Sequence, residues 1–302
     1  MSNSVLVVGS VAFDNIETPA GRVQNVLGGA ASYASIAASL FAPVSMVGVV
    51  GNDFHEEHLQ LFRDRNIDLE GLQIRADGKT FRWSGDYNED LNQANTHETH
   101  LGVFEEFNPT LPDSYLQSTF VLLGNINPEL QLRTLQQATG AKLLLCDTMN
   151  LWINIAREKV LEIFSRVHVA VLNDMEAKML TGDDNVITAG KKLQNLGPEH
   201  VIIKKGEHGA LMFSDGSIFC APSFPLDEVV DPTGAGDSFA GAFMGYLAST
   251  DDLSPENLRR AVVYGSVVAS ATVQDFSVRA LAALTRDEVE SRFAAVRQLS
   301  QF

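Results

Sequence analysis

Six short apolar runs, separated by stretches with helical spacing, constrain the fold of this chain more than any other feature. The runs cover residues 4–9, 44–50, 120–124, 142–147, 167–173 and 200–205. Each is continuously hydrophobic, as in "SVLVVG" and "VSMVGVV", and does not alternate between apolar and polar residues. Continuous hydrophobicity over the length of a strand indicates strands that are buried on both faces, as in a parallel sheet.

Helical patterns fill the spaces between and after these runs. Helices are expected at 29–41, 53–65, 128–139, 187–196, 235–249, 255–273 and 286–299. This alternation predicts an α/β fold with a doubly wound, mostly parallel sheet flanked by helices, which binds ligands beyond the carboxyl ends of its strands. No linker divides the sequence, so a single domain over residues 1–302 is expected.

Two polar excursions interrupt the pattern. Residues 78–108 contain short alternating pieces, "TFRWSG" and "THLGVFE", which predict a β-hairpin that leaves the main sheet. A second piece is "ETPAGRVQNVLGG", and the two excursions lie near 14–27 and 78–108. If they pair with each other, they form a small β lid over the site. The alternative is a floppy surface loop, although loops of this length are usually functional.

The composition limits the classes of partner. The net charge is −16, from 22 basic and 38 acidic residues, and no basic run is present. Such a surface repels nucleic acid and anionic membranes, so neither is expected as a partner. Cys146 and Cys220 have no metal-binding spacing and are expected to be buried free thiols, which fits a reducing compartment. A cytoplasmic location is therefore expected.

The stretch "VVDPTGAGDSFAGAFMGYL" combines small residues with the start of a helix. Gly234, Ala235 and Gly236, called the cradle below, lie between two aspartates, and apolar residues follow at helical spacing. A helix N-terminus with free N–H groups binds anions, and small residues allow a ligand to approach closely. Asp237 lies in the first turn. It could cap the helix, or it could take the proton from a hydroxyl that attacks a phosphoryl group.

The segment "DPTGAGDSFAGAF" resembles, almost residue for residue, the C-terminal signature of the ribokinase-like (phosphofructokinase-B type) family of ATP-dependent carbohydrate and nucleoside kinases. The resemblance implies a ribokinase-like fold and an ATP-dependent phosphotransferase. It also implies that Asp237 is the general base, and that Gly234, Ala235 and Gly236 form the anion hole for the transferring phosphate.

The N-terminal part resembles the same family. "GGAASYASIAASLF" is similar to its first signature, and Asp14 in "GSVAFDN" matches the aspartate that accepts hydrogen bonds from substrate hydroxyls. The backbone of Gly28 and Gly29 can lie against those hydroxyls, because glycine carries no side chain. Without the resemblance, Asp14 could be a turn residue and the glycines could open a closely packed helix.

Two further segments resemble the nucleotide-binding part of the family. In "LNDMEAKMLTG", Asn173 and Glu176 are implied to bind Mg²⁺ through water, although the same spacing also indicates a helix cap. In "VIIKKGEHGALMF", Lys204 is implied to contact an ATP phosphate and Gly206 to form the turn. The alternative for Lys204 is solvent exposure at a strand end. Thr233 is assigned to the nucleotide side of the cradle.

The chain departs from the family pattern near the substrate. Tyr33 stands where the family usually has Asn, and Phe13, Phe81 and Trp83 add more rings. These rings could stack on a nucleobase or a sugar face, or could pack the lid onto the core. Asn125 is a further candidate for binding a substrate hydroxyl. Because the lid region is acidic, a substrate without phosphate is favoured.

A second departure concerns potassium. In "VQDFSVRA", Phe276 and Ser277 replace a Gly-Ala pair whose backbone helps to hold a monovalent cation in many relatives. The replacement argues against K⁺ activation, although Asp231 and Thr233 remain available as ligands. Asp147 and Asn150 follow a strand on the expected site edge, and the sequence assigns neither a role.

The sequence therefore predicts an ATP- and Mg²⁺-dependent kinase that phosphorylates a primary alcohol, most simply that of a nucleoside. The alternative acceptor is a free sugar or cyclitol such as ribose, fructose or inositol. An alternative of another class is a non-catalytic nucleotide or sugar sensor, against which the intact Asp237 and cradle argue. A dinucleotide-dependent oxidoreductase is excluded, because no G-x-G-x-x-G follows the first strand. The protein is expected to be a monomer or a homodimer through the lid.

Overall fold

The computed structural model describes residues 3–88 and 91–301, which form a nine-stranded central sheet and a smaller four-stranded sheet. The central strands are β1 (Val5–Val8), β4 (Val44–Val50), β5 (Ile67–Ile74), β8 (Phe120–Leu123), β9 (Leu143–Asp147), β10 (Val169–Asn173), β11 (His200–Lys204), β12 (Ala210–Ser214) and β13 (Ser217–Ala221). Their order is β13-β12-β11-β10-β9-β8-β1-β4-β5. All neighbours are parallel except β11–β12 and β12–β13, so the predicted mostly parallel sheet is confirmed.

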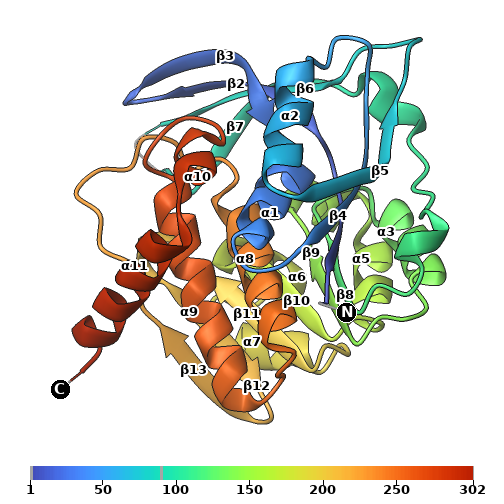
Figure 1. Cartoon of the computed structure of the whole chain (residues 1–302). Coiled ribbons are helices and arrows are strands. Elements are labelled where there is room, and N and C mark those ends of the chain that lie inside the picture. The colour runs from blue at the N-terminus through green and yellow to red at the C-terminus, as the bar shows by residue number, and fades with distance from the viewer. Residues whose placement is uncertain (1–2, 89–90, 302) are drawn as a thin grey trace.

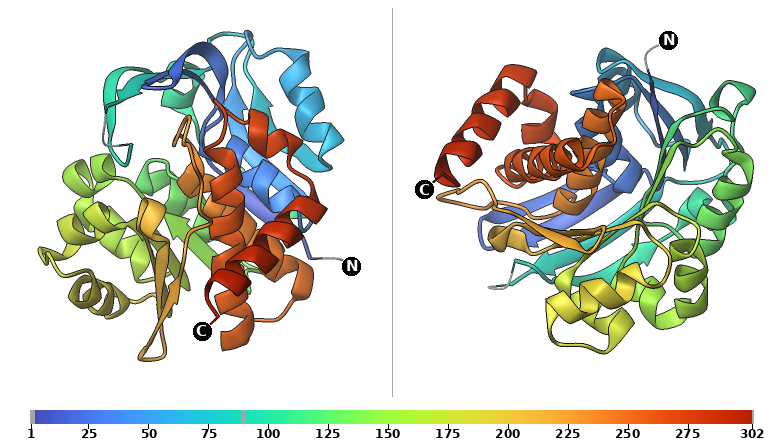
Figure 2. Two further views of the ribbon diagram at one scale, coloured as in Figure 1. Left: turned by 90° about the vertical axis from the view of Figure 1, so that its left-hand side faces the viewer. Right: turned by 90° about the horizontal axis from the view of Figure 1, so that it is seen from below.

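Helices cover both faces of this sheet (Figures 1 and 2). They are α1 (Ala30–Ser39), α2 (Glu56–Asp64), α3 (Pro128–Gln137), α4 (Asn150–Ile155), α5 (Arg157–Phe164), α6 (Asp174–Thr181), α7 (Val186–Gln194), α8 (Ala235–Thr250), α9 (Pro255–Thr272), α10 (Arg279–Ala283) and α11 (Arg286–Leu299). In Figure 1, α1, α8 and α9 lie on one face, and α3, α5, α6 and α7 lie on the other.

The two layers of helices explain why the strands are apolar throughout. In β1, Val5 and Val7 pack into the core beneath α1, α8 and α9, whereas Leu6 and Val8 pack into the core beneath α5, α6 and α7. Successive side chains of a strand point to opposite faces, so both sets must be hydrophobic. All four residues are 0% exposed.

The smaller sheet has the strand order β3-β2-β6-β7 and comes from the two polar excursions. Its strands are β2 (Ala12–Thr18), β3 (Gly21–Gly28), β6 (Phe81–Tyr87) and β7 (Ala94–His100). Strand β2 pairs antiparallel with β3 and parallel with β6, which joins the two excursions. The predicted hairpins are therefore present and do pair, and the floppy-loop alternative is wrong. This sheet, called the lid, lies at the top of Figure 1.

A partly buried polar contact fixes the base of the lid. Asp53, which follows β4, accepts hydrogen bonds from the Thr80 backbone N–H and hydroxyl, both at 2.8 Å, and from Arg82 Nη2 at 2.8 Å. Burial raises the pKa of the Asp53 carboxyl, but these hydrogen bonds outweigh it and lower the pKa to about 2. The Arg82 guanidinium also lies over the ring of Phe13, 5.1 Å from its centroid. The outer face of the lid is thus attached to the main sheet.

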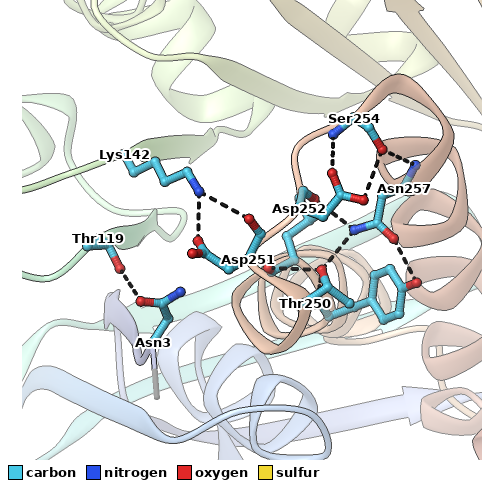
Figure 3. A network of polar contacts seen from close by, with 10 residues as sticks. Asn3, Thr119, Lys142, Thr250, Asp251, Asp252, Ser254 and Asn257 are labelled. Carbon is cyan, nitrogen blue, oxygen red and sulfur yellow. Dashed lines mark hydrogen bonds and ion pairs between the residues drawn. The ribbon is translucent and has the colours of Figure 1, made fainter. Parts of the chain in front are cut away.

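The C-terminal end of α8 is held by a polar network (Figure 3). Tyr246 donates to Asn257 Oδ1 at 2.9 Å, and Asn257 Nδ2 donates to Thr250 Oγ1 at 2.8 Å. Asp251 pairs with Lys142, which precedes β9, at 2.7 Å. These contacts fix the C-terminal end of α8 against the amino-end edge of the sheet, so its N-terminus lies at the opposite edge, where ligands are expected.

The two edge strands of the central sheet differ from the sequence analysis, one by an omission and one by a failed expectation. Strand β5 was not predicted, because its sequence "IDLEGLQI" places polar and apolar residues in a mixed order on an edge strand. Cys146 is buried as expected, but Cys220 is exposed, because β13 is the other edge strand. Among the described residues, no helix is long and apolar enough to cross a membrane.

Candidate active site

The carboxyl ends of three neighbouring strands bring the nucleotide-side residues together. Asp147 ends β9, Asn173 ends β10 and Lys204 ends β11, and Asn173 is directly paired with Lys204. The start of α8 lies beside them: a Cβ on Gly236 would be only 2.7 Å from Lys204 Nζ. Residues predicted from separate motifs therefore lie together at the carboxyl ends of the central strands.

The cradle has the geometry of an anion site. Helix α8 begins at Ala235, as predicted, and its N-cap residue Gly234 has a left-handed φ of 76° without a side-chain cap hydrogen bond. The N–H of Ala235 donates to the Pro232 carbonyl at 3.2 Å. Within residues 3–88 and 91–301, no acceptor faces the N–H of Gly234 or Gly236. Free N–H groups at the positive end of a helix dipole attract phosphate.

Glycine is required at position 234 for a second reason. A Cβ on Gly234 would lie 2.4 Å from ring atoms of Tyr33, so the phenol ring packs directly against the cradle. Tyr33 is 1% exposed, and its hydroxyl has no hydrogen-bond partner among the described residues. Buried polar groups are usually paired, so this hydroxyl is available to a ligand.

Asp237, the third residue of α8, does not cap the helix. Burial raises the pKa of its carboxyl, the charge of Asp147 raises it further and Lys204 opposes both, which gives a pKa of about 7. A carboxylate that titrates near neutrality is well matched to general base catalysis. The cap interpretation therefore has no hydrogen bond to support it, and the base stays a prediction.

Lys204 is held by a carboxylate that the sequence left without a role. Its Nζ lies 3.0 Å from Asp147 Oδ2, and Asp147 is 4% exposed. The Lys204 side chain is 18% exposed, so the solvent-exposed alternative is wrong. Burial lowers the pKa of the Lys204 ammonium, but Asp147 and Glu176 more than offset this and raise it. A fixed positive charge thus lies beside the cradle.

Asn173 and Glu176 form the capping box that was one of their two interpretations. Asn173 Oδ1 accepts from the Glu176 N–H at 2.8 Å, and Glu176 Oε2 accepts from the Asn173 N–H at 2.7 Å. Within the described part of the chain, no hydrogen bond reaches the second oxygen of Glu176. Burial raises the pKa of Glu176, Lys204 lowers it, and the resulting pKa is about 7.

On the lid side, Asp14 is a buried carboxylate without a partner. It is 4% exposed, and none of the described residues donates a hydrogen bond to it. Burial raises its pKa to about 8, with further contributions from Asp231 and Asp237. A Cβ on Gly28 would lie 1.8 Å from Asp14 Oδ2, so only glycine leaves room for the carboxylate. Gly29 opens α1 with a φ of 91°. A buried, unpaired carboxylate indicates a site for ligand hydroxyls.

Comparison with known proteins agrees with this geometry. A model of the family described as pfkB family carbohydrate kinase matches residues 2–284. The chain belongs to the PfkB family of carbohydrate kinases. As a member of this family the protein is an ATP-dependent phosphotransferase, which confirms the prediction from the sequence.

PfkB relatives with nucleoside substrates are among the similar proteins. A cytidine kinase of Thermococcus kodakarensis is 35% identical over 249 residues, which are 80% of this chain and 88% of that protein. The structure of the Methanocaldococcus jannaschii nucleoside kinase has a TM-score of 0.78 at 20% identity, covering 98% of this chain and 99% of that one. The Burkholderia thailandensis nucleoside kinase in complex with inosine has a TM-score of 0.78 at 19% identity, covering 96% and 97%. The two structures establish the ribokinase fold.

The rings predicted near the PfkB substrate site divide between the two faces of the lid. Asp14 is paired with Trp83 across β2 and β6, and Phe13 is paired with Arg82. Paired residues share a face, so Trp83 lies beside Asp14, whereas Phe13 lies on the opposite face. Phe13 packs against Phe54, with ring centroids 5.6 Å apart. Phe13 therefore attaches the lid to α2 and does not adjoin Asp14.

Other candidates are used in packing. Asn125 accepts from Trp152 Nε1 and donates to Met149 Sδ, both at 3.0 Å, which attaches the start of α4 to the end of β8. Phe81 stacks on Phe104 and packs the lid onto the core. Asn150 begins α4 and is exposed. The sequence placed Asn125 at the correct edge of the sheet, but side-chain partners from other elements could not be foreseen.

One residue that contacts the cradle turn, residues 231–237, was not predicted. Tyr87, at the end of β6, accepts a hydrogen bond from Thr233 Oγ1 at 3.1 Å. The only signal in the sequence is its spacing. Tyr87 is four residues beyond Trp83, so in a regular strand the two side chains lie on the same face of the sheet. Asp231, at the start of the turn, is 0% exposed.

Proposed function

We propose that this PfkB kinase phosphorylates the primary hydroxyl of a nucleoside, with ATP as the donor. The proposal is carried by the buried, unpaired carboxylate of Asp14. Asp14 shares a face of the lid with Trp83, and the charge of Asp237 contributes to its raised pKa. Ribose hydroxyls suit the carboxylate, and a nucleobase suits the indole ring. The similarity to a cytidine kinase and to two nucleoside kinase structures supports the same acceptor.

In the proposed reaction, Asp14 accepts hydrogen bonds from two sugar hydroxyls while the backbone of Gly28 and Gly29 lies against the sugar. The primary hydroxyl oxygen attacks the γ-phosphorus of ATP, and the bond from that phosphorus to the bridging oxygen breaks to release ADP. Asp237 takes the hydroxyl proton. The N–H groups of the cradle stabilise the charge on the transferring phosphoryl group.

The nucleotide-side residues fit Mg²⁺ and ATP. Among the described residues, no group of three or more His, Cys, Asp or Glu side chains could hold a metal ion by itself. Mg²⁺ is commonly bound by one or two carboxylates together with water and phosphates, which the available oxygen of Glu176 and the side chain of Asn173 would suit. The ion would neutralise phosphate charge. Lys204 would contact the phosphates, and Gly206, with a φ of 53°, would form the adjacent turn.

Replacing K⁺ by Na⁺ at constant ionic strength is expected to change kcat by less than about twofold, because Phe276 and Ser277 replace the Gly-Ala pair of the cation site and one N–H group already bonds to each oxygen of Asp231. Asp231 accepts from the Thr233 N–H at 2.9 Å and from the Ser277 N–H at 3.1 Å. The measurement is initial velocity in chloride salts of K⁺, Na⁺ and tetramethylammonium. Tenfold activation by K⁺ alone would show that these bonds leave room for a cation.

The alternative acceptor is a free sugar or cyclitol, which the family's description as carbohydrate kinases favours. A panel separates the two: cytidine, uridine, adenosine, inosine, guanosine, ribose, fructose, myo-inositol and fructose 6-phosphate, each with Mg-ATP and coupled detection of ADP. At least one nucleoside is expected to exceed ribose in kcat/KM by about tenfold or more, because the apolar surface of the base is buried and stacking of an aromatic pair adds about 0.5–1.5 kcal/mol to that burial. Turnover confined to ribose, fructose or inositol would overturn the nucleoside assignment.

Two properties remain predictions. The chain is proposed to be a monomer or a homodimer through the lid, whose edge strands β3 and β7 carry backbone groups that a second copy could pair with. Light scattering on the purified protein distinguishes the two states. A cytoplasmic location is proposed because ATP is the donor.

A further inference from the structure

A tyrosine of the lid contacts the turn that carries the proposed base. Thr233 Oγ1 donates to the Tyr87 hydroxyl oxygen at 3.1 Å, across 146 residues of sequence. Tyr87 is the last residue of β6, and Thr233 lies directly before the cradle. The contact therefore joins the element that covers the acceptor to the element that would bind the transferring phosphate.

Burial and the nearby carboxylates keep the Tyr87 hydroxyl protonated. Burial raises the pKa of the phenol, and the negative charges of Asp231, Asp14 and Asp237 raise it further. Tyr87 therefore remains a neutral phenol, which can accept the hydrogen bond from Thr233 without adding a negative charge beside the cradle.

The same hairpin also reaches the nucleotide turn. A Cβ on Gly206 would lie 2.3 Å from Asn92 Oδ1, and Asn92 Nδ2 donates to Glu207 Oε2 at 3.4 Å. Asn92 lies two residues before β7, and Gly206 begins the short 3-10 turn Gly206–His208. The lid hairpin therefore contacts both the cradle turn and the turn assigned to ATP.

We propose that Tyr87 is a positioning residue: through its hydrogen bond to Thr233, a lid that covers the acceptor also holds the cradle in place. When the lid lies over an acceptor, the Tyr87–Thr233 hydrogen bond holds the cradle turn with its N–H groups in place for the phosphoryl group. Without it, the turn is less restrained and water is less well excluded from the γ-phosphate. This inference rests on the proposed role of residues 233–237 and applies to a nucleoside or a sugar acceptor alike.

Tyr87→Phe tests the proposal, because it removes only the hydroxyl. The loss of one neutral hydrogen bond is expected to lower kcat by about 2- to 13-fold while KM for ATP stays within about twofold. The ratio of ADP released to acceptor phosphorylated is expected to rise above one, as water replaces the acceptor. A role confined to lid stability would lower the melting temperature without changing this ratio.

Tyr246→Phe is the matched control. It also removes a tyrosine hydroxyl that is hydrogen-bonded at 2.9 Å, but at the far end of α8. It is expected to lower the melting temperature and to leave kcat and the product ratio unchanged. If Tyr87→Phe and Tyr246→Phe have the same kinetic profile, the proposal is wrong.

Thr233→Val supplies the second arm. If Tyr87 acts through Thr233, Tyr87→Phe in the Thr233→Val background should cost less than about twofold, because the partner is already absent. An undiminished cost in that background would overturn the coupling even if Tyr87→Phe alone slows the enzyme. If Thr233→Val and Asp237→Asn both retain full activity, the proposed role of the turn itself fails, which is distinguishable from failure of the Tyr87 coupling. Thr233→Val also tests the contact from the other side if Tyr87→Phe does not fold.

Discussion

Asp237→Asn is expected to lower kcat by about 10²–10⁴-fold, the range for the loss of a general base, while ATP binding and the fold persist. Asparagine has the shape of aspartate but cannot take a proton from the acceptor hydroxyl. Helix α8 should still form, because no side chain caps it. The measurements are ADP release with the best acceptor, ATP binding by calorimetry and the melting temperature.

The pH dependence provides a second readout of the same residue. The pKa of Asp237 is about 7, so the basic form is depleted below neutrality. At saturating acceptor and Mg-ATP, the wild-type kcat is expected to fall about tenfold per pH unit below pH 7 and to level off above it, because bound acceptor holds Asp14 in its charged form and leaves Asp237 as the titrating group. The Asp237→Asn variant should not show this fall in rate below pH 7, because an amide does not titrate.

Asp251→Asn controls for the removal of a carboxylate from α8. Asp251 is the C-cap residue in a left-handed conformation with a φ of 51°, which asparagine also tolerates, and it pairs with Lys142 at the surface. Its kcat and pH profile should match those of the wild type within about twofold, since exposed ion pairs contribute little. An Asp237→Asn variant that keeps more than half of the wild-type rate would rule out the base.

The sequence predicted the framework because its physical signals are local. A strand buried on both faces must be apolar throughout, so β1, β4 and β8 to β11 were each visible as continuous runs. The edge strand β5 gave no such signal, since one of its sides meets solvent. The cradle was visible because glycine and small residues leave a distinctive stretch before an apolar helix.

Parts of the site that depend on contacts between distant elements were not predictable. Lys204 and Asp147 are 57 residues apart, and Tyr87 and Thr233 are 146 apart, so no local pattern links them. Phe13 shows the converse case, in which the sequence predicted a neighbour that the structure does not have. It is adjacent to Asp14 in the sequence, yet adjacent residues of a strand face opposite sides, so proximity along the chain placed it wrongly.

The raised pKa values of Asp14, Asp237 and Glu176 have a common cause, since burial contributes most to each. Burial of ionisable groups disfavours their charged forms and so costs folding stability near neutral pH. Three such carboxyls around the candidate site, one on the lid and two beside the central sheet, are expected of a functional site, where folding stability is given up for ligand binding. Asp14 is the clearest case, because no protein donor compensates its charge.

Asp14→Asn should lower kcat/KM for the acceptor by about 10²–10⁴-fold, because hydrogen bonds to a charged group contribute about 1.5–3 kcal/mol each and two are proposed. KM for ATP should stay within about twofold, since Asp14 lies on the lid. Asp86→Asn is the control. Asp86 also lies on the lid, but its carboxylate accepts from Asn95 Nδ2 at 2.8 Å and contacts His97. It should leave acceptor kinetics unchanged.

The same Asp14→Asn substitution should raise the melting temperature at pH 8. The pKa of Asp14 is about 8 in the folded protein and near 3.8 in the unfolded chain. The folded state therefore binds more protons across this window, and the wild type loses stability as pH rises from about 4 to 8. Asparagine is neutral throughout, so the difference between variant and wild type should be small at pH 4 and grow toward pH 8. Because the acceptor's hydroxyls should compensate the Asp14 charge, saturating acceptor should narrow the difference. A variant that is less stable than the wild type at pH 8 and still phosphorylates the acceptor normally would show that Asp14 has a protein partner and is not the acceptor's site.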